Sequence, residues 1–304
     1  MKNIVCFGEC MVELRSSGGA AMTMAFGGDT LNTATYLARM LTGSFNICYA
    51  TALGDDAAYS GEMLKSWHLE NIDTRFVTRL AGQLPGLYTI QVDAKGERTF
   101  SYWRNDAAAR KYFDAPSSPL EDHPDQIDVF YISGISLAIL PPRARQRLFA
   151  LMQKLHDAGK TIIFDNNYRP RLWATAQDAD EAYAQAFALC DIALITLSDE
   201  AERLALGEQD ALSAAFALPC PEIVVKRGAG STLLKTGAGR FEVPTRPVAN
   251  IIDTTAAGDS FGAGYIAARL SGSDPATSAQ SGNALAATVI QHRGAIIPRD
   301  KMPV

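Results

Sequence analysis

Small residues and two acids are concentrated in the segment DTTAAGDSFGAGY, residues 253–265. Apolar residues follow at helical spacing, so we expect a helix to begin near Asp259 or Ser260. The first N–H groups of a helix have no partner within it and attract anions, and the small residues before the helix leave room for one. There Asp259 could accept the proton of an attacking hydroxyl while the N–H groups bind a phosphoryl group. An acid at this place can equally be a simple helix cap.

A second glycine-led helix start occurs in AFGGDTLNTATYLARM. Gly27 and Gly28 precede the predicted helix, and Asp29 or Thr30 would be its cap. Asn32 lies in the first turn, which makes the loop open, polar and suited to sugar hydroxyls. A tight connection between a strand and a helix explains the two glycines equally well.

Arginines accompany aromatic residues in two segments: YWRND contains Arg104, and DNNYRPRLW contains Arg169 and Arg171. A planar guanidinium offers forked donors that match a carboxylate. One arginine beside a tryptophan is more often surface packing. Two such clusters in an acidic protein favour a ligand that carries a carboxylate.

The segment VVKRGAGSTLL ends a predicted strand with Lys226, Arg227, Gly228 and Gly230. It could bind the phosphates of a nucleotide or form a plain β-turn. The sequence contains no G-x-x-x-x-G-K-[ST] motif, and no G-x-G-x-x-G opens the first βα unit. The pattern therefore disfavours P-loop NTPases and dinucleotide-binding proteins of the usual kind.

Composition excludes several classes of protein. The chain has 304 residues, 47% of them hydrophobic and 20% charged, with a net charge of −5, which is ordinary for a soluble enzyme. Negative charge disfavours nucleic acids and anionic membranes as partners. Five scattered cysteines and four histidines lack metal-ligand spacing, so we expect reduced thiols and no structural zinc. No signal peptide or membrane span is apparent, and we expect a cytoplasmic protein that binds a small metabolite.

The order of predicted elements indicates an α/β protein. Strand-length apolar runs alternate with helix-like stretches, and the strands are NIVCFG, DVFYISGIS, TIIFDNN, DIALITLS and EIVVKRG. Such alternation predicts a mostly parallel sheet covered by helices on both faces. A further helical pattern over residues 197–218 is interrupted at Gly207. We expect a single domain over residues 1–304.

In one region the apolar residues recur at every second position, in place of the continuous apolar runs of the other predicted strands. Apolar side chains alternate from Tyr88 to Val92, the turn DAKG follows at residues 93–96, and a second alternating run comes after it. This pattern predicts an antiparallel hairpin. We expect a lid over about residues 84–104 with part of 10–24, although an immobile edge hairpin or a dimer surface would give the same pattern.

These motifs together resemble the PfkB (ribokinase-like) family of carbohydrate kinases, over essentially the whole chain. The family signature Asp-Thr-x-Gly-Ala-Gly-Asp corresponds to residues 253–259. The resemblance implies a ribokinase-like α/β fold with a small β lid, Asp259 as general base, and an anion hole from the backbone of Ala256, Ala257, Gly258 and Asp259. Glycine is commoner at position 256, so a positive φ there would strain the alanine.

Within that family the chain is similar to the kinases of 2-keto-3-deoxygluconate, through segments that include FGGDTLNTA, GERTFSYWRN and FDNNYRPRLW. The resemblance implies that ATP, with Mg²⁺, phosphorylates the C6 hydroxyl of 2-keto-3-deoxy-D-gluconate to give 2-keto-3-deoxy-6-phosphogluconate. It implies that Arg104 and Arg169 bind the C1 carboxylate. The other sugar-site residues it implies are Gly28, Asn32, Tyr88, Tyr102 and Ile135.

The same resemblance implies a nucleotide site. It assigns Lys226, Gly228 and Gly230 to the phosphates and Asn283 to the adenine. The family's Asn-x-x-Glu motif, which binds metal through water, corresponds to residues 197–200, where leucine replaces the asparagine and only Glu200 carries over. Asp253 either supports a monovalent cation or braces its loop.

Three other functions fit the sequence. They are a kinase of another sugar, such as fructose or a related sugar acid, a non-catalytic sugar-binding regulator on the same fold, and a structural protein without a ligand. A homo-oligomer through the lid is a further expectation.

Overall fold

A computed structural model describes residues 1–16, 21–92 and 98–303. The predicted hairpin turn at residues 93–96 and part of the predicted lid segment 10–24 lie outside the described residues.

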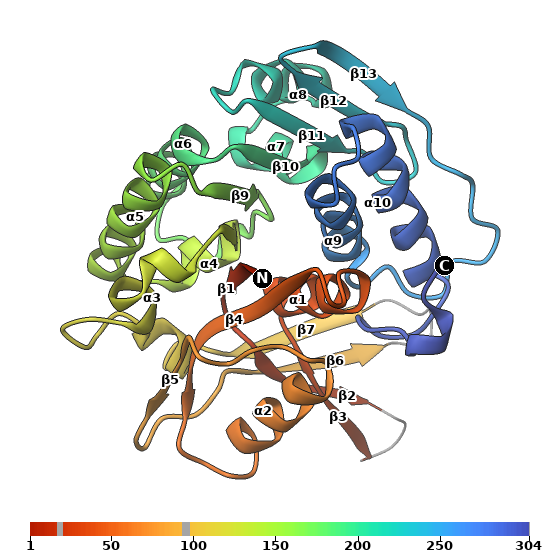
Figure 1. Cartoon of the computed structure of the whole chain (residues 1–304). Coiled ribbons are helices and arrows are strands. Elements are labelled where there is room, and N and C mark those ends of the chain that lie inside the picture. Colours follow the sequence, from red (N-terminus) through yellow and green to blue (C-terminus); the bar gives the residue numbers. More distant parts are fainter. Residues whose placement is uncertain (17–20, 93–97, 304) are drawn as a thin grey trace.

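The centre of the molecule is a large sheet, whose described strands follow the order β13-β12-β11-β10-β9-β8-β1-β4-β5. The strands from β11 to β5 are parallel, and β12 and β13 are antiparallel. Their bounds are β1 Lys2–Phe7, β4 Phe45–Gly54, β5 Val77–Leu80, β8 Val129–Ser133, β9 Thr161–Asp165, β10 Ile192–Thr196, β11 Glu222–Lys226, β12 Thr232–Thr236 and β13 Gly239–Val243. The predicted α/β class is confirmed (Figure 1).

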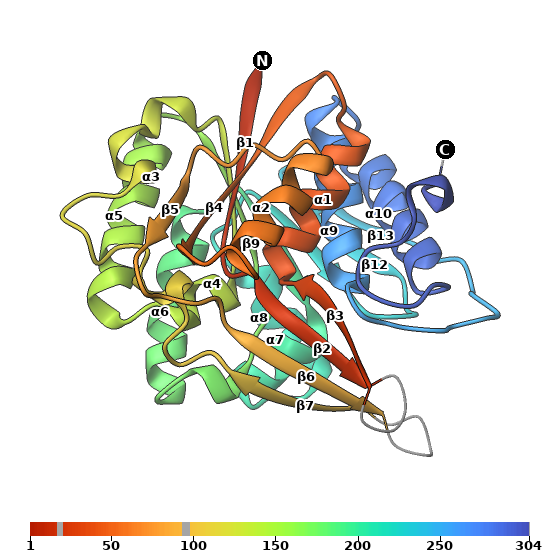
Figure 2. The same cartoon turned by 90° about the horizontal axis from the view of Figure 1, so that it is seen from below.

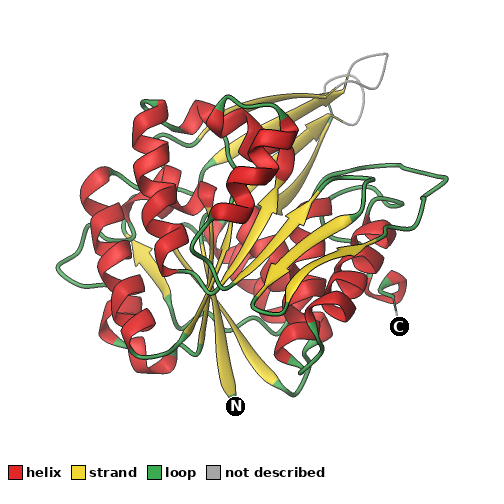
Figure 3. Ribbon diagram, turned by 90° about the horizontal axis from the view of Figure 1, so that it is seen from above, coloured by secondary structure: helices red, strands yellow, loops and turns green. Residues whose placement is uncertain are grey.

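Helices cover both faces of this sheet (Figure 3). One layer contains α1 Asp29–Met40, α2 Ser60–Leu69, α9 Ala257–Leu270 and α10 Pro275–Val289. The other contains α3 Pro119–Asp122, α4 Gly134–Ile139, α5 Pro142–Asp157, α6 Ala176–Leu189, α7 Leu197–Leu204 and α8 Glu208–Ala217. Short 3₁₀ turns occur at Ala108–Lys111, Pro124–Gln126, Pro170–Leu172 and Arg299–Lys301.

Strand β1 shows how the two cores are divided. Ile4 and Cys6 pack with the first helix layer, while Val5 and Phe7 pack with the second. Successive side chains of a strand point to opposite faces, so a strand buried on both sides is apolar throughout. This explains why the sequence showed continuous apolar runs here.

Helices α9 and α10 lie unusually close together. A Cβ at Gly264 would lie only 2.9 Å from the Cα of Gly282 on the neighbouring helix. Side chains at either position would push the helices apart, because 2.9 Å is well below carbon–carbon contact distance. The close packing fixes α9, whose first turn carries Asp259.

The second sheet has the order β3-β2-β6-β7. Its strands are β2 Met11–Ser16, β3 Met22–Gly27, β6 Leu87–Val92 and β7 Arg98–Trp103. Strands β6 and β7 pair antiparallel, as the alternation predicted, and β2 joins the hairpin as a parallel neighbour of β6. Tyr88 and Ile90 are buried and lie on the same face. The second sheet projects from one end of the main body (Figure 2).

Across the part of the chain that the structure describes, no helix combines the length and apolar character needed to cross a bilayer. All five cysteines are buried free thiols.

Candidate active site

The site lies where the connections of the main sheet reverse direction. The chain continues from β1 to β4 and β5 on one side, whereas β8, β9, β10 and β11 lie on the other. Ligands of open α/β sheets bind at such a switch point, beyond the carboxyl ends of the strands. A cavity of about 1090 Å³ lies there, between the second sheet and the starts of α1 and α9.

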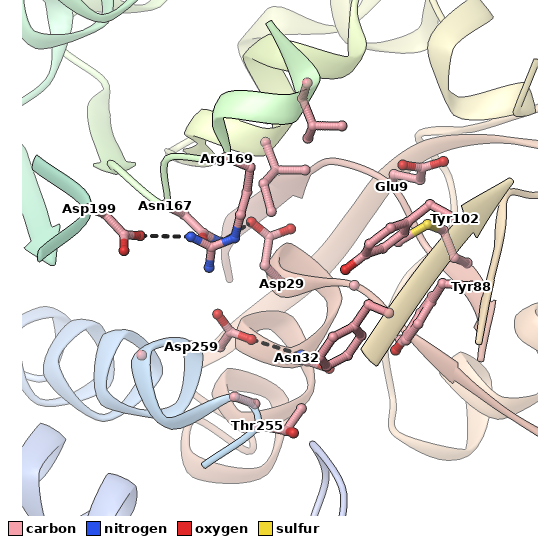
Figure 4. A pocket seen from close by; sticks show the side chains of 18 of the residues that line it. Glu9, Asp29, Asn32, Tyr88, Tyr102, Asn167, Arg169, Asp199, Thr255 and Asp259 are labelled. Carbon is pink, nitrogen blue, oxygen red and sulfur yellow. Dashed lines mark hydrogen bonds and ion pairs between the residues drawn. The ribbon is translucent and has the colours of Figure 1, made fainter. Parts of the chain in front are cut away.

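Most of the residues predicted for the site line this one cavity. They are Gly28, Asn32, Tyr88, Tyr102, Arg104, Ile135, Arg169, Arg171, Lys226, Ala256, Ala257, Gly258 and Asp259. Figure 4 shows Asp259 and Arg169 on one side of the cavity and the two tyrosines on the other.

Helix α9 begins earlier than the apolar spacing predicted. Its first residue is Ala257 and its N-cap is Ala256, so neither Asp259 nor Ser260 is the cap. The apolar spacing marks the buried face of a helix but not the turn before it. Ala256 has φ 61° and ψ 18°, the left-handed conformation, so the expected strain is present. Asp259 consequently lies in the first turn, beside N–H groups that the helix leaves unpaired.

Neighbouring charges tune the acidity of Asp259. Burial, together with the negative charges of Asp29 and Asp165, raises its pKa to about 7. A hydrogen bond of 2.8 Å from Asn32 Nδ2 to Asp259 Oδ2 and the charge of Lys226 oppose this rise. Asp259 is therefore a carboxyl group that can gain or lose a proton near neutral pH, as a general base requires.

Helix α1 also starts differently from the prediction. Gly28 is its N-cap in extended conformation, and neither Asp29 nor Thr30 caps it. Gly28 is required for space, because a Cβ there would come within 2.0 Å of the backbone oxygen of Glu9. Because Asp29 does not cap the helix, its side chain can line the cavity, where it accepts a hydrogen bond of 2.7 Å from Asn167 Nδ2.

Lys226, at the end of β11, reaches toward the start of α9. Its Nζ donates to Asp165 Oδ2 over 2.8 Å, and a side-chain carbon at Gly258 would lie 3.6 Å from it. Burial raises the pKa of Asp165, and Lys226 opposes that rise. Asp165 was not predicted as a site residue, although it lies in a predicted strand at the edge of the sheet where ligands bind.

The other side of the cavity is aromatic. The rings of Tyr88 and Tyr102 stack with centroids 5.8 Å apart. Arg104 lies close to Tyr102 and forms a buried ion pair with Glu9. Among the described residues, Glu9 Oε1 and Arg104 Nε have no hydrogen-bond partner. Glu9 was also not predicted as a site residue. The sequence feature that could have indicated it is its position just after the first predicted strand.

Arg169 is exposed and donates from Nη1 to Asp199 Oδ2 over 2.9 Å. Each arginine predicted to bind a carboxylate therefore already contacts a protein acid. Arg171 lines the same cavity.

Four predicted residues do not line the cavity: Gly228, Gly230, Asn283 and Glu200. Glu200 is buried and accepts hydrogen bonds from Arg203 (2.6 Å) and Asn166 (3.3 Å). Asn283 accepts a hydrogen bond of 2.9 Å from Thr232, while its Nδ2 has no partner in the described structure. Among the described residues, no three His, Cys, Asp or Glu side chains are grouped to hold a metal ion.

Known proteins resemble this chain over nearly its whole length. A family model described as pfkB family carbohydrate kinase matches residues 1–302. The chain is 46% identical to the 2-dehydro-3-deoxygluconokinase of Escherichia coli K12, over 99% of both chains. It is 41% identical to the Haemophilus influenzae protein of that name, over 98% of this chain and 96% of the other.

Solved structures show the same fold. Fructokinase with bound ATP from Xylella fastidiosa has a TM-score of 0.82 at 23% identity, covering 99% of this chain and 95% of its own. Aminoimidazole riboside kinase from Salmonella enterica, complexed with aminoimidazole riboside and an ATP analogue, has a TM-score of 0.81 at 24% identity. The match covers 97% of this chain and 95% of that chain.

Proposed function

The chain belongs to the PfkB family of carbohydrate kinases, and from this premise we propose that it phosphorylates 2-keto-3-deoxy-D-gluconate at the C6 hydroxyl. This sugar acid is the 2-dehydro-3-deoxygluconate for which the relatives of 41–46% identity are named. The observation that carries the mechanism is the position of Asp259, a carboxyl with a pKa of about 7 in the first turn of α9, facing the cavity.

Asp259 acts as the general base. Its carboxylate accepts the proton of the C6 hydroxyl as that oxygen forms a bond to the γ-phosphorus of ATP and the bond from phosphorus to the β-phosphate oxygen breaks. The products are ADP and the 6-phosphate. The N–H groups of Gly258 and Asp259 face the developing negative charge, while that of Ala257 donates to the backbone oxygen of Thr254 over 3.2 Å. Lys226 adds a positive charge nearby.

The substrate lies between Asp259 and the tyrosines. Tyr88 and Tyr102 pack against its carbon chain, while Arg169 and Arg104 supply donors for the C1 carboxylate. Both arginines pair with a protein acid, but the pair of Arg104 with Glu9 is buried, whereas the side chain of Arg169 is half exposed. Arg169 can therefore exchange its partner Asp199 for the substrate carboxylate more easily than Arg104 can leave Glu9. This division is supported by the different exposure of the two ion pairs.

ATP approaches from the β11 side. Gly228 and Gly230 form the turn after Lys226, and Asn283 offers an unpaired amide nitrogen for the adenine. Mg²⁺ on ATP keeps several waters and needs few protein oxygens. The cavity acid Asp29, which accepts from the neutral amide of Asn167, suits its hydrated form better than Asp165, which is paired with Lys226. The Mg²⁺ neutralises phosphate charge when bound. Glu200, paired with Arg203, is a poorer candidate for the indirect contact first assigned to it.

The hydrogen bonds of Asp253 favour one of the two roles predicted for it. Its carboxylate accepts hydrogen bonds from two backbone N–H groups and from Arg15. This supports a brace of the loop over a site for a monovalent cation.

The second sheet serves as the lid. Closure over the sugar would exclude water and limit ATP hydrolysis. Its outer face exposes Met22, Met24 and Trp103, which supports a homo-oligomer through this sheet.

The function is tested by ADP release with Mg-ATP and four sugars: 2-keto-3-deoxygluconate, its galactonate epimer, fructose and ribose. We expect turnover with the keto-deoxy acids, little ATPase activity without sugar, and loss of turnover in Asp259→Asn. Turnover on fructose alone would overturn the substrate assignment. Binding without turnover on any sugar would favour the non-catalytic regulator.

A further inference from the structure

A continuous chain of hydrogen-bonded side chains joins the second sheet to the loop before α9. Tyr88, whose ring lines the cavity, donates from its hydroxyl to Glu13. Arg15 donates to Glu13 Oε1 over 3.2 Å and to Asp253 Oδ2 over 3.3 Å. We call these four residues the bridge. Its two ends belong to elements far apart in the sequence. Figure 4 labels Tyr88, at one end, and Thr255, two residues after Asp253 at the other end.

Asp253 passes this connection on to the backbone of the anion hole. Its Oδ1 accepts from the N–H of Thr255, and its Oδ2 accepts from the N–H of Gly294, each over 2.9 Å. Thr255 directly precedes Ala256, whose left-handed conformation starts the first turn of α9. The orientation of Asp253 therefore affects where the N–H groups beside Asp259 point.

One guanidinium, that of Arg15, contacts both carboxylates of the bridge. The side chains of Glu13 and Asp253 are 9% and 3% exposed, and Arg15, at 25%, lies between them. Loss of this positive charge would weaken the electrostatic stabilisation of both buried carboxylates, because little water reaches them to replace it. Glutamine at position 15 could donate to one acid but would carry no charge to either.

We propose that Arg15 is a positioning residue, which aligns the anion-hole loop with the sugar-binding sheet so that occupation of the sugar site and phosphoryl transfer are coupled. Arg15 itself does not line the cavity. This inference rests on the proposed kinase function for its kinetic readouts. A misplacement of about 1 Å at a reacting group can reduce turnover about 100-fold, so a residue outside the cavity can have a large effect on kcat.

The first experiment compares Arg15→Gln with Arg143→Gln, a control at an exposed arginine of α5. We expect Arg15→Gln to lower kcat at least tenfold with the sugar KM changed less than threefold, and Arg143→Gln to match wild type. Guanidinium at millimolar concentration should restore part of the kcat of Arg15→Gln only, and Arg15→Lys should be intermediate. A kcat of Arg15→Gln within twofold of wild type would overturn the proposal.

A double-mutant cycle tests the coupling itself. If the bridge transmits the effect, the factor by which Tyr88→Phe lowers kcat should be at least three times smaller in the Arg15→Gln background than in wild type. Tyr102→Phe is the matched control, because Tyr102 lines the same cavity but is not part of the bridge. Its effect should be the same in both backgrounds, and an equally additive result for Tyr88→Phe would contradict the coupling.

Hydrogen exchange of residues 253–259 without ligands separates this proposal from the proposed function. We expect the amides of this segment to exchange at least tenfold faster in Arg15→Gln than in Arg143→Gln. Should the wild type phosphorylate none of the sugars, the proposed function fails while this measurement still decides the role of Arg15. Unchanged exchange would overturn that role even in an active kinase.

Discussion

Asn32 Nδ2 donates to Asp259 Oδ2 over 2.8 Å, which joins the first turn of α1 to the first turn of α9. Both side chains line the cavity, and they belong to two helices that pack in the same layer. The contact uses Oδ2 and restricts the plane of the carboxyl group, so we expect Oδ1 to accept from the substrate hydroxyl. The orientation of the proposed base is therefore restricted by a residue 227 positions away in the sequence.

Replacing the base should abolish turnover and spare binding. Asp259→Asn keeps the shape of the side chain but cannot accept the proton, so kcat should fall about 10²–10⁴-fold. Sugar binding, measured by the ligand-induced rise in melting temperature, should persist. Asp300→Asn, at an exposed acid, serves as control and should match wild type. A kcat of Asp259→Asn within tenfold of wild type would show that another group takes the proton.

The pH dependence of kcat/KM should show an acidic limb near pH 7. Only ionised Asp259 can act as a base, and its pKa is about 7, so activity should rise as pH increases through that value. Removing the negative charge in Asp29→Asn should move the limb to lower pH. Removing the hydrogen bond in Asn32→Ala should move it to higher pH. Rate profiles from pH 5 to 9 measure both shifts, and movement in the same direction would contradict this origin of the pKa.

The strained turn at Ala256 should tolerate glycine and reject a branched residue. A non-glycine residue in left-handed conformation costs about 1–3 kcal/mol, and Ala256→Gly relieves this while adding chain entropy to the unfolded state. We expect Ala256→Gly to keep kcat within about twofold and to change stability by less than about 1 kcal/mol. Ala256→Val should destabilise the protein by about 1–3 kcal/mol and reduce kcat. Urea unfolding and kcat check both, and a fully active Ala256→Val would be inconsistent with the geometry.

The sequence predicted the architecture because periodicity reports burial directly. The five predicted apolar runs correspond to β1, β8, β9, β10 and β11, and the alternation around Tyr88 corresponds to β6, whereas β4, β5, β12 and β13 of the main sheet were not predicted. Helix starts were less predictable: α9 begins at Ala257 because of a left-handed residue, which leaves no mark on apolar spacing. Glu9 and Asp165 were missed for another reason, since their importance comes from residues that only the fold brings near, Arg104 and Lys226.

The buried pair of Glu9 and Arg104 should matter for stability as well as for substrate. Both side chains are buried, so Glu9→Ala leaves an unpaired guanidinium and should cost about 3–5 kcal/mol. The pair of Glu62 with Lys65 is the matched control, because its side chains are 48% and 72% exposed. Glu62→Ala should cost less than about 1 kcal/mol. Urea unfolding measures both values, and equal costs would show that the buried pair is not held as described.

Arg169 provides the sharpest test of substrate class. A hydrogen bond to a charged group contributes about 1.5–3 kcal/mol, so Arg169→Ala should lower kcat/KM for the keto-deoxy acid roughly 10- to 150-fold. A neutral sugar has no carboxylate to lose, and any slow turnover of fructose should change less than threefold. Asp199→Asn removes the acid that now accepts from Arg169 and leaves the guanidinium in place. It should therefore retain or improve the KM for the acid. An equal loss of kcat/KM on both sugars in Arg169→Ala would mean that this arginine contacts ATP or supports the loop. Only a residue that binds the carboxylate distinguishes the two substrates.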